Sequence, residues 1–181
     1  AIGSGEMALV IAGGVESMSR ALYVVGRADT AFARGLKLED TTLGWRFVNP
    51  KMHQAYGTDA MGETAEAVAE EWHIARADQD AFAYRSQQRA AAAIAAGRLA
   101  EELVPVDVPQ RKGSIAVTLD EHPRADTTLE ALAKLKPIIK PDGTVTAGNA
   151  SGINDGACAV LLASEAAVKA HGLTPRARYV A

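Results

Sequence analysis

Thiol chemistry is almost absent from this sequence, because Cys158 is the only cysteine among 181 residues. One cysteine excludes a disulfide within the chain and any metal site built from several cysteines, and it suits a reducing cytoplasm. The four histidines show no metal-ligand spacing, so we expect no metal. Cys158 lies inside an apolar run, where a free cysteine behaves as a small hydrophobe, and we expect it to be buried and inert.

Long hydrophobic runs and an excess of positive charge are also missing. No apolar run approaches the ~20 residues that cross a bilayer, and no signal peptide is visible. The net charge of −3 argues against nucleic acid as a partner, since binding to a phosphate backbone needs many lysine and arginine contacts. An apolar content of 48% with 23% charged residues is typical of a globular protein of about one domain.

The most informative segment is a loop of small residues at 145–157, with the sequence VTAGNASGINDGA. Glycine allows another molecule to approach the backbone closely. The loop therefore offers backbone N–H and C=O groups, and the hydroxyl of Ser151, as its binding chemistry. This chemistry suits a thin ligand arm that carries amides. The alternative is a tight entry into the following strand, which is the commoner role of such loops.

Hydrophobic patterns predict two strands buried on both faces, at 7–12 and 157–163. Between them we expect helices at 62–74, 78–96 and 128–135, and two short strands at 103–108 and 114–118. Residues 20–60 have no sustained period and carry five aromatic residues, so they form either a functional loop or an interface. The layout predicts an α/β fold in which 1–19 and 145–181 form a sheet domain and 20–144 are an α-rich insertion.

Residues that are typical of helix ends predict several helix boundaries. Gly97 is a fitting residue to follow the second helix, whereas Ala75 offers no side-chain cap at its start. Thr127 and Glu130 predict a capping box for the third helix. Ser164 is expected to cap a last helix that ends at Gly172.

The glycine loop is one of several blocks that resemble thiolases, the coenzyme A-dependent acyltransferases. The other blocks are AGGVESMS at 12–19, RADQDAFA at 76–83, SQQRAAAA at 86–93 and TLEALAKLKP at 128–137. All keep the family's order and spacing from about residue 3 onward. The resemblance implies part of a layered αβα N-terminal half-domain that is interrupted by an α-rich loop domain. It also implies a parent enzyme that cleaves or forms 3-oxoacyl-CoA, with coenzyme A as substrate.

The resemblance further implies which residues border coenzyme A. Ala147 and Ser151 match residues that touch the pantetheine arm, and Met61 matches one that lines the acyl pocket. Leu135 matches an apolar residue on the adenine side, and Ala131 stands where the family often has serine.

Arg124 matches a basic residue near the nucleotide end of coenzyme A. The segment 111–140 holds six lysine and arginine residues against four acidic ones, so the chain is locally basic there, which suits a phosphorylated cofactor. The alternative is a surface arginine that pairs with Asp120 or Asp126.

Some family features point to a subtype, and others are missing. Residues 38–50 resemble β-ketoadipyl-CoA thiolases, and Ala60 stands where acetoacetyl-CoA thiolases have histidine. The motifs Asn-Glu-Ala-Phe, Gly-His-Pro and Cys-x-Gly do not occur, and Cys158 lacks the context of the nucleophile. We therefore expect a middle piece of a homo-oligomeric thiolase, inactive by itself. The alternatives are a non-catalytic module for coenzyme A binding or oligomerisation, and one chain of a split thiolase.

Overall fold

The computed structural model describes residues 1–28 and 30–180. By contact, the chain divides into two compact units. Unit 1 consists of Ala1–Ala21 and Asn154–Ala181, and unit 2 of Leu22–Ile153. Both contain strands and helices, so the predicted α/β class is confirmed.

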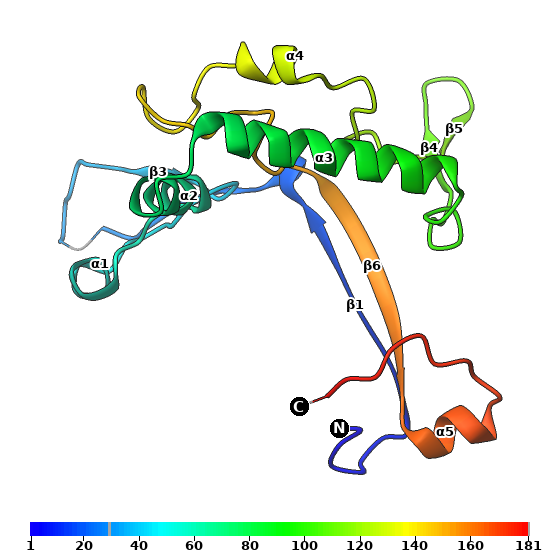
Figure 1. The fold of residues 1–181 in the computed structure, drawn as a ribbon. Helices are drawn as coiled ribbons and strands as arrows, with labels where there is room; N and C mark the ends of the chain where they lie inside the picture. Colours follow the sequence, from blue (N-terminus) through cyan, green and yellow to red (C-terminus); the bar gives the residue numbers. More distant parts are fainter. Residues whose placement is uncertain (29, 181) are drawn as a thin grey trace. The chain divides into compact units, whose positions relative to one another are not determined.

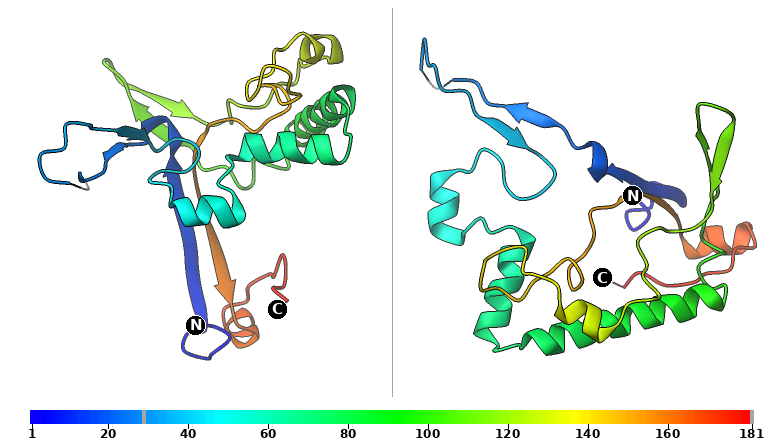
Figure 2. Two further views of the ribbon diagram at one scale, coloured as in Figure 1. Left: turned by 90° about the vertical axis from the view of Figure 1, so that its left-hand side faces the viewer. Right: turned by 90° about the horizontal axis from the view of Figure 1, so that it is seen from above.

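Unit 1 is built on a long antiparallel pair of strands. Strand β1 (Leu9–Ser17) pairs with β6 (Asp155–Ala163) along its whole length, and the two run side by side in every view (Figures 1 and 2). The 3-10 turn η1 (Met18–Arg20) follows β1, and helix α5 (Glu165–Ala170) follows β6. The side chain of Ser164 accepts a hydrogen bond from the backbone N–H of Ala167, which confirms the predicted cap.

The first strand extends beyond its predicted end, because its two central glycines do not terminate it. Gly13 lies opposite Ala159, and a Cβ at Gly13 would stand 2.6 Å from the backbone oxygen of Cys158. A side chain has no room at this point, so glycine serves close approach of the two strands. The predicted end of this strand at residue 12 was wrong for this reason.

The predicted burial of these strands was also wrong. Eight of the nine residues of β6 are exposed, Cys158 among them, and Val15 of β1 is 78% exposed. In the described part of the chain this sheet contains only β1 and β6, and most of their residues are exposed. Apolar strands of this kind are normally buried on both faces by other elements. The described residues of unit 1 do not supply those elements.

Unit 2 contains the remaining elements, and residues 20–60 include two short strands and a helix. There β2 (Tyr23–Val25) pairs with β3 (Leu38–Asp40), and helix α1 (Pro50–Tyr56) follows. Asn49 caps α1 through its side chain, which accepts from the N–H of Lys51 at 2.9 Å, and Pro50 occupies the first helical position. Asn-Pro is thus a helix start that the missing periodicity concealed.

The inserted helices and hairpin lie close to their predicted positions. They are α2 (Met61–Glu71), α3 (Arg76–Ala95), the hairpin of β4 (Val106–Pro109) and β5 (Ser114–Val117), and α4 (Leu129–Ala133), which packs against α3 (Figure 1).

Local chemistry explains where these helices differ from expectation. Helix α2 stops at Glu71 rather than 74, because His73 takes a left-handed conformation with φ 52°. Helix α3 has no side-chain cap at Ala75 and ends before Gly97, whose φ is 70°, as predicted. The cap of α4 is Thr128, whose hydroxyl accepts from the N–H of Ala131 at 3.1 Å, so the prediction of Thr127 was wrong by one residue.

The buried centre of unit 2 is unusually polar. Leu132 and Val145 are buried there, but so are Glu66, Asp80 and Thr146, and Thr146 is completely inaccessible. These residues come from α2, α3, α4 and the glycine loop. The centre of the unit therefore lies where three helices meet the loop that the sequence singled out.

Candidate functional site

The glycine loop begins on a carboxylate that α2 provides. One oxygen of Glu66 accepts from the backbone N–H groups of Thr144 and Val145, each at 2.8 Å. The other oxygen accepts from the hydroxyl of Thr144 at 3.1 Å. Glu66 is 4% exposed, so this acidic side chain of an otherwise charged helix face points inward and fixes two consecutive peptide groups.

A second buried carboxylate, Asp80 of α3, holds the loop further along. Its Oδ1 accepts from the side-chain amide of Asn149 at 3.0 Å. The same amide group donates to the carbonyl of Thr144 at 3.0 Å, while the Asn149 Oδ1 accepts from the N–H of Thr146 at 2.7 Å. Asn149 thereby links Thr144 and Thr146 within the loop, and its hydrogen bond to Asp80 attaches the loop to α3.

Arg76 connects this anchor to α4. Its Nε donates to Asp80 Oδ2 at 2.8 Å, and its Nη2 donates to the carbonyls of Leu132 and Leu135 at 2.7 and 3.1 Å. The guanidinium group thus satisfies carbonyls at the end of a helix, where a cation is favoured. One turn of α3 consequently fixes both the loop and α4.

Gly148 lets the loop lie directly beneath α4. A Cβ at Gly148 would stand 2.5 Å from methyl carbons of both Leu132 and Leu135. The loop also pairs with the chain after α4, since the N–H of Ile138 donates to the carbonyl of Val145 at 3.0 Å. The absence of a side chain at Gly148 is therefore a steric requirement of this packing.

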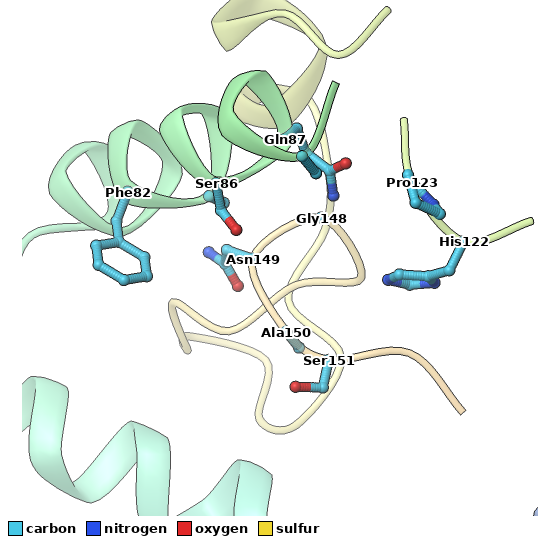
Figure 3. Close-up of a pocket in the computed structure, with 11 residues that line it drawn as sticks. Phe82, Ser86, Gln87, His122, Pro123, Gly148, Asn149, Ala150 and Ser151 are labelled. Atoms are coloured by element: carbon cyan, nitrogen blue, oxygen red, sulfur yellow. The ribbon is translucent and has the colours of Figure 1, made fainter. Parts of the chain in front are cut away.

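A cavity of about 340 Å³ opens beside the loop. Figure 3 shows its walls: Phe82, Ser86 and Gln87 project from α3, His122 and Pro123 come from the segment before α4, and the loop supplies Gly148–Ser151. Small side chains and amide, hydroxyl and imidazole groups line it. Its lining suits a narrow ligand that exchanges hydrogen bonds with amides.

The surroundings of Glu66 favour its ionised form. Burial by itself would raise the pKa of Glu66, and it is the largest single influence on that group. The hydrogen bonds from Val145 and Thr144, with a further contribution from the charge of Lys140, together outweigh burial and hold the pKa of Glu66 below its ordinary value. Glu66 is therefore a charged acceptor at neutral pH.

The structure brings some of the predicted site residues together and leaves others apart. Ser151 lines the cavity, and the exposed Ala147 lies one residue before the half-buried Gly148. Leu135 lies against Gly148 from the end of α4. Ala131 is exposed in the first turn of α4, and Met61 begins α2 with its side chain 83% exposed. Neither Ala131 nor Met61 lines the described cavity.

Arg124 directly follows the cavity residues His122 and Pro123. Its backbone N–H donates to the side chain of Gln87 at 2.7 Å, which ties this segment to α3. The side chain is exposed, and among the described residues it forms no ion pair with Asp120 or Asp126. Its exposed charge lies one residue after Pro123 in the cavity wall.

Sequence reasoning missed the residues that build the loop's support. Glu66, Asp80 and Arg76 are not among the residues predicted for the site. A signal for Asp80 was available, because Arg76 precedes it by four residues and such pairs face each other on a helix. No local signal showed that Glu66 points inward, since its partners lie 78 and 79 residues away.

The described residues hold neither a metal-ligand cluster nor a membrane-spanning helix. Within 1–28 and 30–180, no group of three or more His, Cys, Asp or Glu side chains could hold a metal ion. In the same residues, no helix has the length and apolar character needed to span a membrane.

Comparison with known proteins gives consistent matches. Residues 1–166 match the family model described as thiolase, N-terminal domain. The beta-ketoadipyl-CoA thiolase of Pseudomonas aeruginosa is 66% identical over 178 residues, which are 98% of this chain and 44% of that protein. The 3-oxoadipyl-CoA/3-oxo-5,6-dehydrosuberyl-CoA thiolase of Escherichia coli is 58% identical over 182 residues, 100% of this chain and 45% of that protein.

A solved structure also matches. The human mitochondrial 3-ketoacyl-CoA thiolase in complex with CoA superposes with a TM-score of 0.78 at 44% identity, over 96% of this chain and 42% of that one. The chain therefore spans less than half the length of the proteins that it matches.

Proposed function

The chain belongs to the thiolase family, and from this premise we propose that it is part of an acyltransferase that cleaves or forms 3-oxoacyl-CoA with coenzyme A. The observation that carries the proposal is the cavity at Gly148–Ser151, whose wall of small residues is held by buried carboxylates. We propose 3-oxoadipyl-CoA as the substrate, because relatives that are 58% to 66% identical carry that activity in their names.

In the proposed reaction, a cysteine thiolate of the whole enzyme attacks the 3-keto carbon of the substrate. The bond between C2 and C3 breaks, and acetyl-CoA leaves as a carbanion that is stabilised in an oxyanion hole and then protonated. The thiol of coenzyme A next takes the acyl group and frees the cysteine. The residues described here supply the walls that hold coenzyme A, and none of the reacting atoms.

Each predicted binding residue has a proposed place along coenzyme A. Ser151 and Ala147 border the pantetheine arm, where the loop offers a hydroxyl and backbone amides. Leu135, just after α4, borders the adenine side, and Ala131 of α4 also contacts coenzyme A. Arg124, exposed and without an acidic partner in the described residues, meets a phosphate, because guanidinium groups form strong charge-assisted contacts with phosphate.

Met61 is proposed to line the acyl pocket. Its side chain is 83% exposed at the start of α2, so it is accessible to a ligand or to another part of the whole protein. Gly62 beside it packs tightly against Ile139, which fixes the start of α2 against the chain after α4. Substitution of Met61 should therefore alter acyl-chain preference more than affinity for coenzyme A.

The 181 residues are proposed to be inactive by themselves and to work in a homo-oligomeric, cytoplasmic enzyme. The single cysteine suits the reducing cytoplasm. The uncovered apolar faces of β1 and β6 favour association with further strands or chains. Two alternative functions would use the same apolar faces. The chain would then be a coenzyme A-binding or oligomerisation module without catalysis, or one chain of a split thiolase.

The test compares two proteins in a spectrophotometric assay of thiolysis. The protein that carries this chain should cleave 3-oxoadipyl-CoA faster than acetoacetyl-CoA, and the 181 residues expressed alone should cleave neither. Turnover by the short chain that survives Cys158→Ser would contradict the proposed division of labour, whereas turnover that this change abolishes would make Cys158 a nucleophile. In the longer protein, Ser151→Ala should weaken coenzyme A binding, and the exposed Ser114→Ala in β5 serves as the control.

A further inference from the structure

Two buried carboxylates in unit 2 have no part in the proposed chemistry. Glu66 and Asp80 are each 4% exposed. A carboxylate loses much solvation when it is buried, and hydrophobic residues often stabilise such positions equally well or better. The polar partners of Glu66 are Thr144 and Val145, and those of Asp80 are Asn149 and Arg76. All of these lie in the glycine loop or connect it to α4.

Glu66 fixes the direction in which the loop begins. Hydrogen bonds to two consecutive N–H groups, both at 2.8 Å to one oxygen, set the orientation of the peptide planes at Thr144 and Val145. An apolar residue could fill the same volume without specifying that orientation. Since Val145 also pairs with Ile138, the carboxylate aligns the loop with the chain that follows α4.

Asp80 fixes the loop at the point where it reaches the cavity. It holds the amide of Asn149, which is two residues before Ser151 and itself lines the cavity. Through Arg76 the same carboxylate is linked to the carbonyl of Leu135. The spacing between the two proposed contact regions, Ser151 and Leu135, is thus set by one charged pair on α3.

We propose that Glu66 and Asp80 are positioning residues for coenzyme A. They hold the loop at 144–151 and the end of α4 in the arrangement that binds the cofactor, and they do so before the ligand arrives. This inference rests on the proposed function. Because the same contacts are made before and during the reaction, their loss reduces the affinity for coenzyme A and leaves the chemical step largely unchanged.

The experiment measures kcat and KM for coenzyme A with the whole protein that carries this chain, and the dissociation constant of coenzyme A by calorimetry. Glu66→Ala and Asp80→Ala should each raise KM and the dissociation constant about tenfold and change kcat less than about twofold, as expected when uniform binding is lost. Glu70→Ala is the matched control, since Glu70 lies one turn further along α2, is 77% exposed and forms its ion pair with Lys140 at the surface.

Conservative variants separate positioning from general stability. Glu66→Gln keeps one carbonyl oxygen for the two N–H groups and should recover most of the affinity. Asp80→Asn keeps one acceptor oxygen, which can serve either the Asn149 amide or the Arg76 Nε–H but not both. This variant should bind coenzyme A more tightly than Asp80→Ala and less tightly than the unaltered protein. These variants also decide the matter if an alanine variant does not fold.

The outcomes distinguish the two proposals. If the unaltered protein neither binds coenzyme A nor catalyses thiolysis, the proposed function fails and this inference fails with it. If the unaltered protein is active but the Glu66 and Asp80 variants lower kcat and leave KM unchanged, only this inference is overturned, because a smaller folded fraction lowers the rate without changing the affinity of the molecules that remain.

Discussion

Replacing Gly143 with alanine should damage the glycine loop from a position that does not line the cavity. A Cβ at Gly143 would collide with Glu66 Oε1 and stand 2.8 Å from the carboxylate carbon. Lys140 Cγ would be 2.9 Å away on another side. Gly143 is not in the left-handed region, so the expected damage is steric and does not come from backbone strain.

The magnitude follows from what Glu66 would lose. The carboxylate must move away, but it is held by the N–H groups of Thr144 and Val145, and hydrogen bonds to a charged group contribute about 1.5–3 kcal/mol each. The loss of most of one such bond destabilises the folded protein. Alanine also stiffens the unfolded chain, which stabilises the protein by about 0.4–1 kcal/mol. The net destabilisation is therefore about 1–2 kcal/mol. Overpacking of a filled site costs a similar amount, which supports the figure.

Equilibrium unfolding gives the stability, and amide hydrogen exchange locates the change. In Gly143→Ala, the amides of Thr144 and Val145 should exchange faster than in the unaltered protein. Gly35→Ala is the control, because nothing lies within 4 Å of a Cβ built there and its φ is not positive. Unchanged stability together with unchanged protection at Thr144 and Val145 would refute the view that Glu66 is fixed by the loop.

Three further predictions use other parts of unit 2. Arg124→Ala should weaken binding of coenzyme A by about 1.5–3 kcal/mol and binding of pantetheine thioesters much less, and equal losses in calorimetry would make Arg124 structural. Because the pKa of Glu66 is lowered, its stabilising effect should be complete above the ordinary carboxyl value of 4.5 and disappear as the pH falls through the folded-state pKa. Acid titration of unfolding should show this loss in the unaltered protein, and its persistence in Glu66→Gln would assign it elsewhere. Ala75→Ser should stabilise α3 by about 1 kcal/mol in thermal unfolding, because Ala75 has the extended conformation of a cap but no side-chain acceptor.

The elements with strong local signals were predictable. The length of α3, its end before Gly97 and the cap at Ser164 follow from periodicity and terminal residues, and the structure agrees at each. Helix α1 was missed because its seven residues are too few to show a helical hydrophobic periodicity. Asn49 and Pro50 are nevertheless residues that typically begin a helix. Local chemistry of the chain is therefore readable where it acts over a few residues.

Burial was the harder quantity to predict. The apolar pattern of β1 and β6 indicates that both faces need cover, but a pattern does not say where the cover comes from. Cys158 was expected to be buried on the same grounds, and it is exposed. Glu66 shows the reverse error, because an acidic residue on a charged helix is normally solvated, and only contacts nearly 80 residues away turn it inward.

The use of carboxylates beneath the glycine loop has a physical reason. A loop made of Gly148, Asn149, Ala150 and Ser151 has almost no apolar area to bury, so hydrophobic packing cannot fix its position. Its backbone N–H groups are nevertheless strong donors that must be satisfied wherever they are buried. A buried ionised acceptor satisfies two of them at once and also dictates their direction, which a methyl group cannot do. A surface that binds through its backbone therefore needs a polar support, and Glu66 of α2 and Asp80 of α3 provide it.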